Sequence, residues 1–147
     1  MRNTLLILFI SLFGSSIYAQ NKNADTLIAS KKKADMTYKQ LMEIMGSSLS
    51  MIQQGVIREN KQMVIEGASF ILNHPAPRYK PWTIMKKSDQ NDFKQSLLSY
   101  DETLDVHARR AMEEAKKENW LESSNAAHDL TNSCITCHLV WKSKVIR

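Results

Sequence analysis

Apolar residues recur at alternating steps of four and three along much of this chain, and this spacing restricts the fold more than any other feature. The steps run 4, 3, 4, 3, 4 from Tyr38 to Val56, and the same steps run from Phe93 to Ala111. Such steps bring apolar side chains to one face of an α-helix. Only four glycines and three prolines interrupt the 147 residues. We therefore expect an all-α fold.

The pattern predicts four helices. The first covers about residues 38–56, and the second covers 61–73. Apolar positions from 93 to 111 mark the third helix, and positions from 127 to 145 mark the fourth. Segment 74–82 holds all three prolines and is predicted to be a loop. Four amphipathic helices with such connections favour a single domain with an antiparallel up-down-up-down four-helix bundle.

The first nineteen residues have the pattern of a secretory signal peptide. Arg2 precedes the apolar run Leu5–Phe13, and Ala19 supplies a small residue at the expected cleavage site. The run is shorter than the about 20 residues that a membrane-spanning helix needs. Cleavage after Ala19 would leave residues 20–147 as the mature domain, exported to the periplasm, with no membrane span.

Charge and export narrow the classes of function. The formal net charge is +5, and it falls to +4 when Arg2 is removed. This small excess does not indicate nucleic-acid binding, and Lys31–Lys33 are interpreted as a solvated face. Outside the reducing cytoplasm, a cysteine pair is normally oxidised, bound to metal or used covalently.

The two cysteines of the chain are three residues apart near its C-terminus, and a histidine directly follows the second. On a helix, Cys134, Cys137 and His138 project from one side. A thioredoxin-like dithiol expects a βαβ setting, and a zinc site needs a fourth ligand, of which there is no sign. A disulfide explains the cysteines but gives His138 no role. C-x-x-C-H is also the attachment motif of c-type haem, with two thioether bonds and a proximal histidine on iron.

With this motif the chain resembles the cytochrome c prime superfamily, whose members are exported four-helix bundles with C-x-x-C-H in the last helix. There, two residues, an aromatic residue and Arg or Lys follow the motif, and here Leu139–Lys142 reads LVWK. Low-spin members use a methionine four residues before a glycine as the sixth iron ligand, as Met42 precedes Gly46. The resemblance covers essentially the whole mature chain. It implies one covalent haem c, with iron bound by His138 and Met42, and Met45 in reserve.

Three hypotheses of function follow. Met and His ligands leave no open iron position, so the first is an exported electron carrier, not an enzyme, with a redox protein as partner. If no methionine reaches the iron, the second is a five-coordinate protein that binds NO or CO. The third is a disulfide-bonded helical interaction module without haem. The sequence identifies neither the redox partner nor a monomeric or homodimeric state.

The remaining histidines receive structural interpretations. His107 lies on the apolar face of the third helix, where we expect a hydrogen-bonded core or boundary residue. His128 is expected at the surface or between helices. His74 begins the proline-rich loop, predicted at the same end as the C-terminus; we prefer a stiff connection over a cover for the haem edge. Small or polar residues on the inward faces suggest space for a larger group: Ala68, Ala111, Ala127 and His107.

Overall fold

The computed structural model describes residues 23–146, which are mostly helical. Two short 3-10 helices, η1 (Pro81–Ile84) and η2 (Lys142–Lys144), accompany the α-helices. These residues include two isolated β-bridges and no strand. The all-α prediction is therefore confirmed. The five α-helices are α1 (Ala24–Ser30), α2 (Tyr38–Ile57), α3 (Lys61–Asn73), α4 (Gln90–Lys116) and α5 (Trp120–Trp141).

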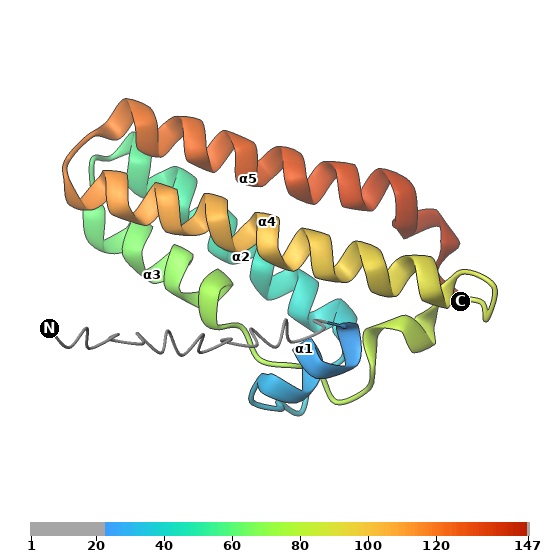
Figure 1. Cartoon of the computed structure of the whole chain (residues 1–147). Coiled ribbons are helices and arrows are strands. Elements are labelled where there is room, and N and C mark those ends of the chain that lie inside the picture. The colour runs from blue at the N-terminus through green and yellow to red at the C-terminus, as the bar shows by residue number, and fades with distance from the viewer. Residues whose placement is uncertain (1–22, 147) are drawn as a thin grey trace, which may run out of the picture.

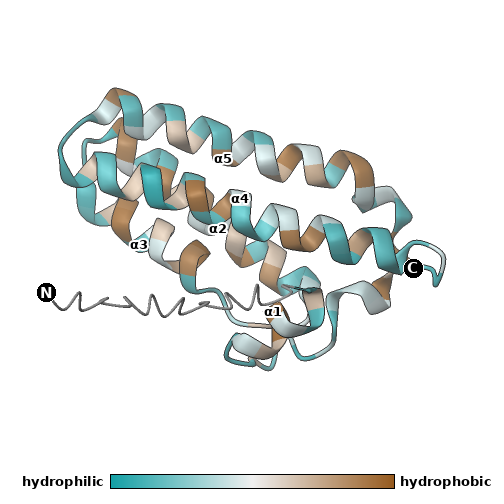
Figure 2. Cartoon of the chain, in the orientation of Figure 1, coloured by the Kyte–Doolittle hydropathy of each residue, from teal (hydrophilic) through white to brown (hydrophobic). Residues whose placement is uncertain are grey.

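The four long helices, α2 to α5, lie side by side (Figure 1). α2 packs against α3 and α5, and α4 packs against the same two helices. The short elements α1 and η1 both contact α4. Apolar and polar residues are interspersed along each helix (Figure 2), as expected for helices with one buried face.

Polar side chains determine where three of the helices begin. Asn23, Thr37 and Asn60 each accept a hydrogen bond from the backbone N–H three residues further on, at 2.9, 3.2 and 3.2 Å. These bonds satisfy N–H groups that the first helical turn leaves without a partner. The sequence pattern predicted four helices and missed α1, because seven residues are too few to show a helical period.

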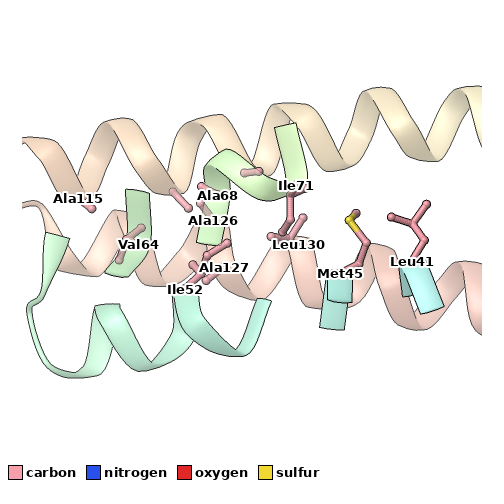
Figure 3. Close-up of a cluster of buried hydrophobic side chains, with 12 residues drawn as sticks. Leu41, Met45, Ile52, Val64, Ala68, Ile71, Ala115, Ala126, Ala127 and Leu130 are labelled. Carbon is pink, nitrogen blue, oxygen red and sulfur yellow. The ribbon is translucent and has the colours of Figure 1, made fainter. Parts of the chain in front are cut away.

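The interior between the long helices is built around small side chains. Ala68, Ala111 and Ala127 are 0%, 0% and 4% exposed and belong to one buried cluster. Figure 3 shows Ala68 and Ala127 within this cluster. None of the three lines the cavity described below. The expectation that they leave space for a larger group is therefore wrong. Their size instead allows the helices to approach closely.

Two glycines set the distance between α2 and α3. A Cβ atom at Gly67 would lie 2.6 Å from the carbonyl oxygen of Ser48 and 2.9 Å from Cγ1 of Ile52. A Cβ atom at Gly55 would lie 2.8 Å from both the backbone nitrogen and Cγ2 of Val64. Any side chain at either position would push the two helices apart.

A second apolar cluster closes one end of the long helices. It contains Trp82 of η1, Phe93 of α4 and Trp141 of α5, and the last two ring centroids are 5.1 Å apart. The tail after α5 is held at the same end, because the N–H of Ile146 donates to the carbonyl of Ile84 at 2.8 Å. The proline-rich loop therefore lies beside the C-terminal end of α5, as predicted.

No helix within residues 23–146 is long and apolar enough to cross a membrane. The predicted signal peptide, residues 1–19, and its cleavage site lie outside the described residues. The last residue, Arg147, lies outside them as well.

Candidate functional site

One cavity, of about 310 Å³, is bounded by α1, α2, α4 and α5. Met42, Cys134, Cys137 and His138, the four site residues predicted from sequence, all line it. The structure thus brings the methionine of α2 to the same cavity as the motif of α5. Much of the remaining wall is apolar and includes Leu41, Leu49, Leu97 and Leu104.

The C-terminal half of α5 contributes two thiols and an imidazole to this cavity. Cys134 and Cys137 are half-buried, and His138 is exposed, so the cavity reaches the surface at the histidine. Both cysteines are free thiols. Burial raises the pKa of each thiol, and the nearby Cys134 adds to the rise at Cys137. The helical position predicted for the motif is confirmed.

α2 contributes two methionine side chains to the wall of the cavity. Met45 is 8% exposed and belongs to the buried cluster, whereas Met42 is half-buried and packs against that cluster. Both methionines line the cavity, as does Gly46. A Cβ atom at Gly46 would meet no other atom within 4 Å. The space beside Gly46 on this turn of α2 is therefore open.

A partly buried polar cluster forms one edge of the cavity. Lys31 Nζ lies 2.7 Å from His74 Nε2 and 2.8 Å from Asp101 Oδ1. The three side chains are only 14%, 12% and 17% exposed, in that order. His74 and Asp101 both line the cavity. Sequence reasoning missed Lys31 and Asp101, because no local pattern connects residues that lie in three distant segments.

The neighbours of His74 restrict how its ring bonds. Nδ1 lies 3.1 Å from the carbonyl oxygen of Pro75, which only accepts, so Nδ1 carries a hydrogen. Nε2 accepts from Lys31 when the ring is neutral, and it donates to Asp101, 3.1 Å away, when the ring is protonated. Lys31 donates a hydrogen bond to Asp101 whether the His74 ring is neutral or protonated. The proline-rich loop therefore does more than connect two helices.

The Lys31–His74–Asp101 cluster predicts a pH-dependent contribution to stability. Burial by itself raises the pKa of the Asp101 carboxyl, but hydrogen bonds from His74 and Lys31 outweigh it and hold the pKa below its ordinary value. This stabilises the fold above the ordinary pKa, and the contribution is lost as pH falls through the lowered one. We expect Asp101→Asn to reduce the free energy of unfolding at neutral pH by about 1–3 kcal/mol. Urea unfolding from neutral to acidic pH measures both effects.

Asp105 offers a matched control one turn along α4. Burial and then the nearby Asp101 raise the pKa of the Asp105 carboxyl, so its ionised form opposes folding. The stability of the Asp105→Asn variant at neutral pH should therefore equal or exceed that of the wild type. An Asp101→Asn variant as stable as the wild type at neutral pH would show that the cluster contributes nothing.

The other two histidines lie away from the cavity wall. His128 is exposed, as predicted for a surface residue. His107 is half-buried, and its Nδ1 is buried without a hydrogen-bond partner among residues 23–146. The hydrogen bond expected for His107 is therefore missing at this atom, because no donor or acceptor in the described part of the chain reaches it.

The side chains around the cavity could hold a haem rather than a bare ion. Within the described residues, no three His, Cys, Asp or Glu side chains form a group that could hold a metal ion. The cavity instead offers two thiols for covalent attachment, one imidazole and two thioethers, against an apolar wall. These are the groups that c-type haem sites use.

Comparisons with protein-family models, curated proteins and solved structures found no match for this chain. The chemistry of the cavity is therefore inferred from the residues that line it.

Proposed function

We propose that this protein is an exported mono-haem c-type cytochrome of the cytochrome c prime type, which transfers electrons and is not an enzyme. The haem is attached through Cys134 and Cys137, and its iron is bound by His138 and Met42. One observation supports the proposal above all: these four residues line a single cavity. Met42 is separated from the motif by α3 and α4, so closeness in sequence does not explain why they meet.

Each residue of the cavity has a separate role in this proposal. The two thiols anchor the haem, and His138, next to Cys137, is the proximal ligand. The thioether of Met42 would also bind the iron and so exclude other ligands. The bound haem supplies an iron that gains and loses one electron. Methionine ligation and the apolar leucines around it favour ferrous iron and raise the reduction potential.

We also propose that the long helices form the antiparallel up-down-up-down bundle that the sequence predicts. Each of the helices α2 to α5 packs mainly against two of the others, which is consistent with a four-helix bundle. In such bundles, cofactors are bound between facing helices. Helices packed in this way would hold a covalently attached haem firmly, so that little would need to rearrange on electron transfer. Its partner in the periplasm would be another redox protein.

The test is the intact mass of the protein produced together with a haem-attachment system. We expect the mass of residues 20–147 plus one haem, and we expect that mass to survive acid–acetone extraction. The variant His138→Ala should keep the added mass but lose the wild-type visible spectrum, because it lacks the proximal ligand. A colourless product with an internal disulfide would favour the interaction module instead.

A gas-binding protein is the second candidate function. It is favoured by the half-buried state of Met42 together with the apolar wall around it. If no methionine bound the iron, this wall would surround a five-coordinate haem that takes NO or CO. A high-spin ferric spectrum in the wild-type protein, with ready CO binding, would identify this alternative.

A further inference from the structure

We propose that the end of the molecule next to His138 is the docking surface for an electron-transfer protein with an acidic face. The inference rests on the proposed function, because a redox partner needs a redox centre to approach. It is carried by the distribution of charge between the two ends of the long helices.

The basic end consists of residues 78–94 and 142–144. Trp82 and Trp141 share one apolar cluster, and a backbone hydrogen bond joins the two segments at Ile84 and Ile146. The two ranges contain two acidic residues and seven cationic ones, an excess of five positive charges. The cationic residues are Arg78, Lys80, Lys86, Lys87, Lys94, Lys142 and Lys144.

The opposite end of the long helices has no such excess. Residues 58–66 and 109–122 contain six cationic and six acidic side chains. Many of these form ion pairs within the same end, such as Lys61 with Glu118 at 3.1 Å. At the basic end, two carboxylates from outside these ranges, Asp25 and Asp35, pair with Lys80, Lys94 and Arg78, which reduces the excess there from five positive charges to three.

Several lysines of the basic end are available to a partner. Lys80 and Lys94 share the carboxylate of Asp25, at 2.6 and 3.3 Å. No ion pair of residues 23–146 involves the other four lysines, which are exposed: Lys86, Lys87, Lys142 and Lys144.

The charged residues adjoin the cavity on two sides. Lys142 comes one helical turn after His138 and so lies near the same face of α5. On the other side, Arg78 and Lys80 stand between Pro77 and Pro81, which line the cavity. Positive charge is thus placed beside the residues that would hold the redox centre.

Exposed apolar side chains stand close to His138 in the sequence of α5. Ile135 is 50% exposed and Leu139 is 76% exposed, and both are within three residues of the histidine on α5. An apolar centre with a charged rim suits a brief encounter between redox proteins, which need little buried area. Because the rim is cationic, the complementary partner carries carboxylates around its own redox centre.

Charge-matched variants test the surface in the haem-loaded protein. Lys142→Glu with Lys144→Glu alters the basic end, and Lys116→Glu with Lys117→Glu makes the same change in net charge at the opposite end. Stopped-flow kinetics would measure the reduction of each by reduced flavodoxin, an acidic electron-transfer protein. A second series would use hexacyanoferrate(III) as an anionic oxidant and tris(phenanthroline)cobalt(III) as a cationic one. Thermal melting checks that both variants are folded.

We expect the wild-type rates with flavodoxin and hexacyanoferrate to fall as salt is added, because salt screens the attraction. The Lys142/Lys144 variant should react about tenfold more slowly with both. The Lys116/Lys117 variant should change them by about twofold or less, because its charges lie far from the cavity. The rate with the cationic oxidant should instead rise as salt is added.

Five results would overturn the proposal. If the two variants slowed the reactions equally, the cause would be the net charge of the protein and not the basic end. If the wild-type rates did not change with salt, the basic end would have no role in docking. If the two variants reacted at equal rates and differed only in their co-sedimentation with phosphatidylglycerol vesicles, the basic end would be a membrane-binding surface. A protein without haem, detected first by its mass, would refute the proposed function and the docking surface together. A haem protein with unaffected kinetics would refute the docking surface alone.

Discussion

Met42→Ala should convert the ferric haem of the loaded protein from low spin to high spin, lower its reduction potential and open it to carbon monoxide. The thioether of Met42 is the sixth iron ligand in the proposed site, and alanine has no group that could replace it. Optical spectra would follow the loss of the weak sulfur-to-iron band in the far red. Redox titration and CO addition would measure the other two changes.

Met45→Ala is the matched control for this prediction. Met45 lies on the same helix and lines the same cavity, but it is more deeply buried and belongs to the apolar cluster. Its removal should cost about 2–5 kcal/mol of stability through lost packing and leave the iron low spin. If Met45→Ala changed the spin state and Met42→Ala did not, the two methionines would exchange roles. A wild-type protein that is already high spin would favour gas binding.

Cys134→Ala combined with Cys137→Ala should abolish covalent haem and loosen one half of the molecule. Without the proposed haem, the cavity between α1, α2, α4 and α5 has no large group to fill it, and its apolar wall loses contacts. The half that packs around the small alanines should stay ordered, because those residues do not line the cavity. Hydrogen exchange should show lost protection in the first half of α2 and the last half of α5, with protection kept around Ala68 and Ala111.

Thr136→Ala is the control within the motif, since Thr136 is exposed and stands between the two cysteines. That variant should keep its haem and its exchange protection. If the double cysteine variant lost protection evenly along all four long helices, the alanine-packed half would not be independent of the haem. If it lost none, the cavity would be stable when empty.

The helices were predictable where apolar spacing extends over several turns. The span 38–56 was predicted for α2, which covers Tyr38–Ile57. In α5 the apolar pattern begins only at Ala127, seven residues after the helix starts at Trp120, because Ser123 occupies a fully buried position and breaks the pattern. Its hydroxyl donates to the carbonyl of Ala111 at 2.9 Å, so a polar residue is accommodated inside.

The candidate site was predictable where its residues form a local motif, or where, as for Met42, they match the resembled family. C-x-x-C-H stands within five residues and needs no tertiary information, whereas Lys31, His74 and Asp101 meet only in the folded chain. The structural role of the small residues could not be predicted from the sequence either. An alanine on an inward face is compatible both with a cavity and with close helix contact, and only the positions of the neighbouring helices distinguish the two.

The close contacts that Gly55 and Gly67 each make with the facing helix restrict which substitutions this sequence can accept. Their Cβ positions fall within 2.9 Å of atoms on the facing helix, so even the smallest side chain would collide there. We expect related chains to retain glycine at both positions, twelve residues apart, while exposed residues of α2 and α3 vary freely. Together with C-x-x-C-H near the C-terminus, this glycine spacing is a sequence pattern that could identify distant relatives whose overall sequence similarity is low.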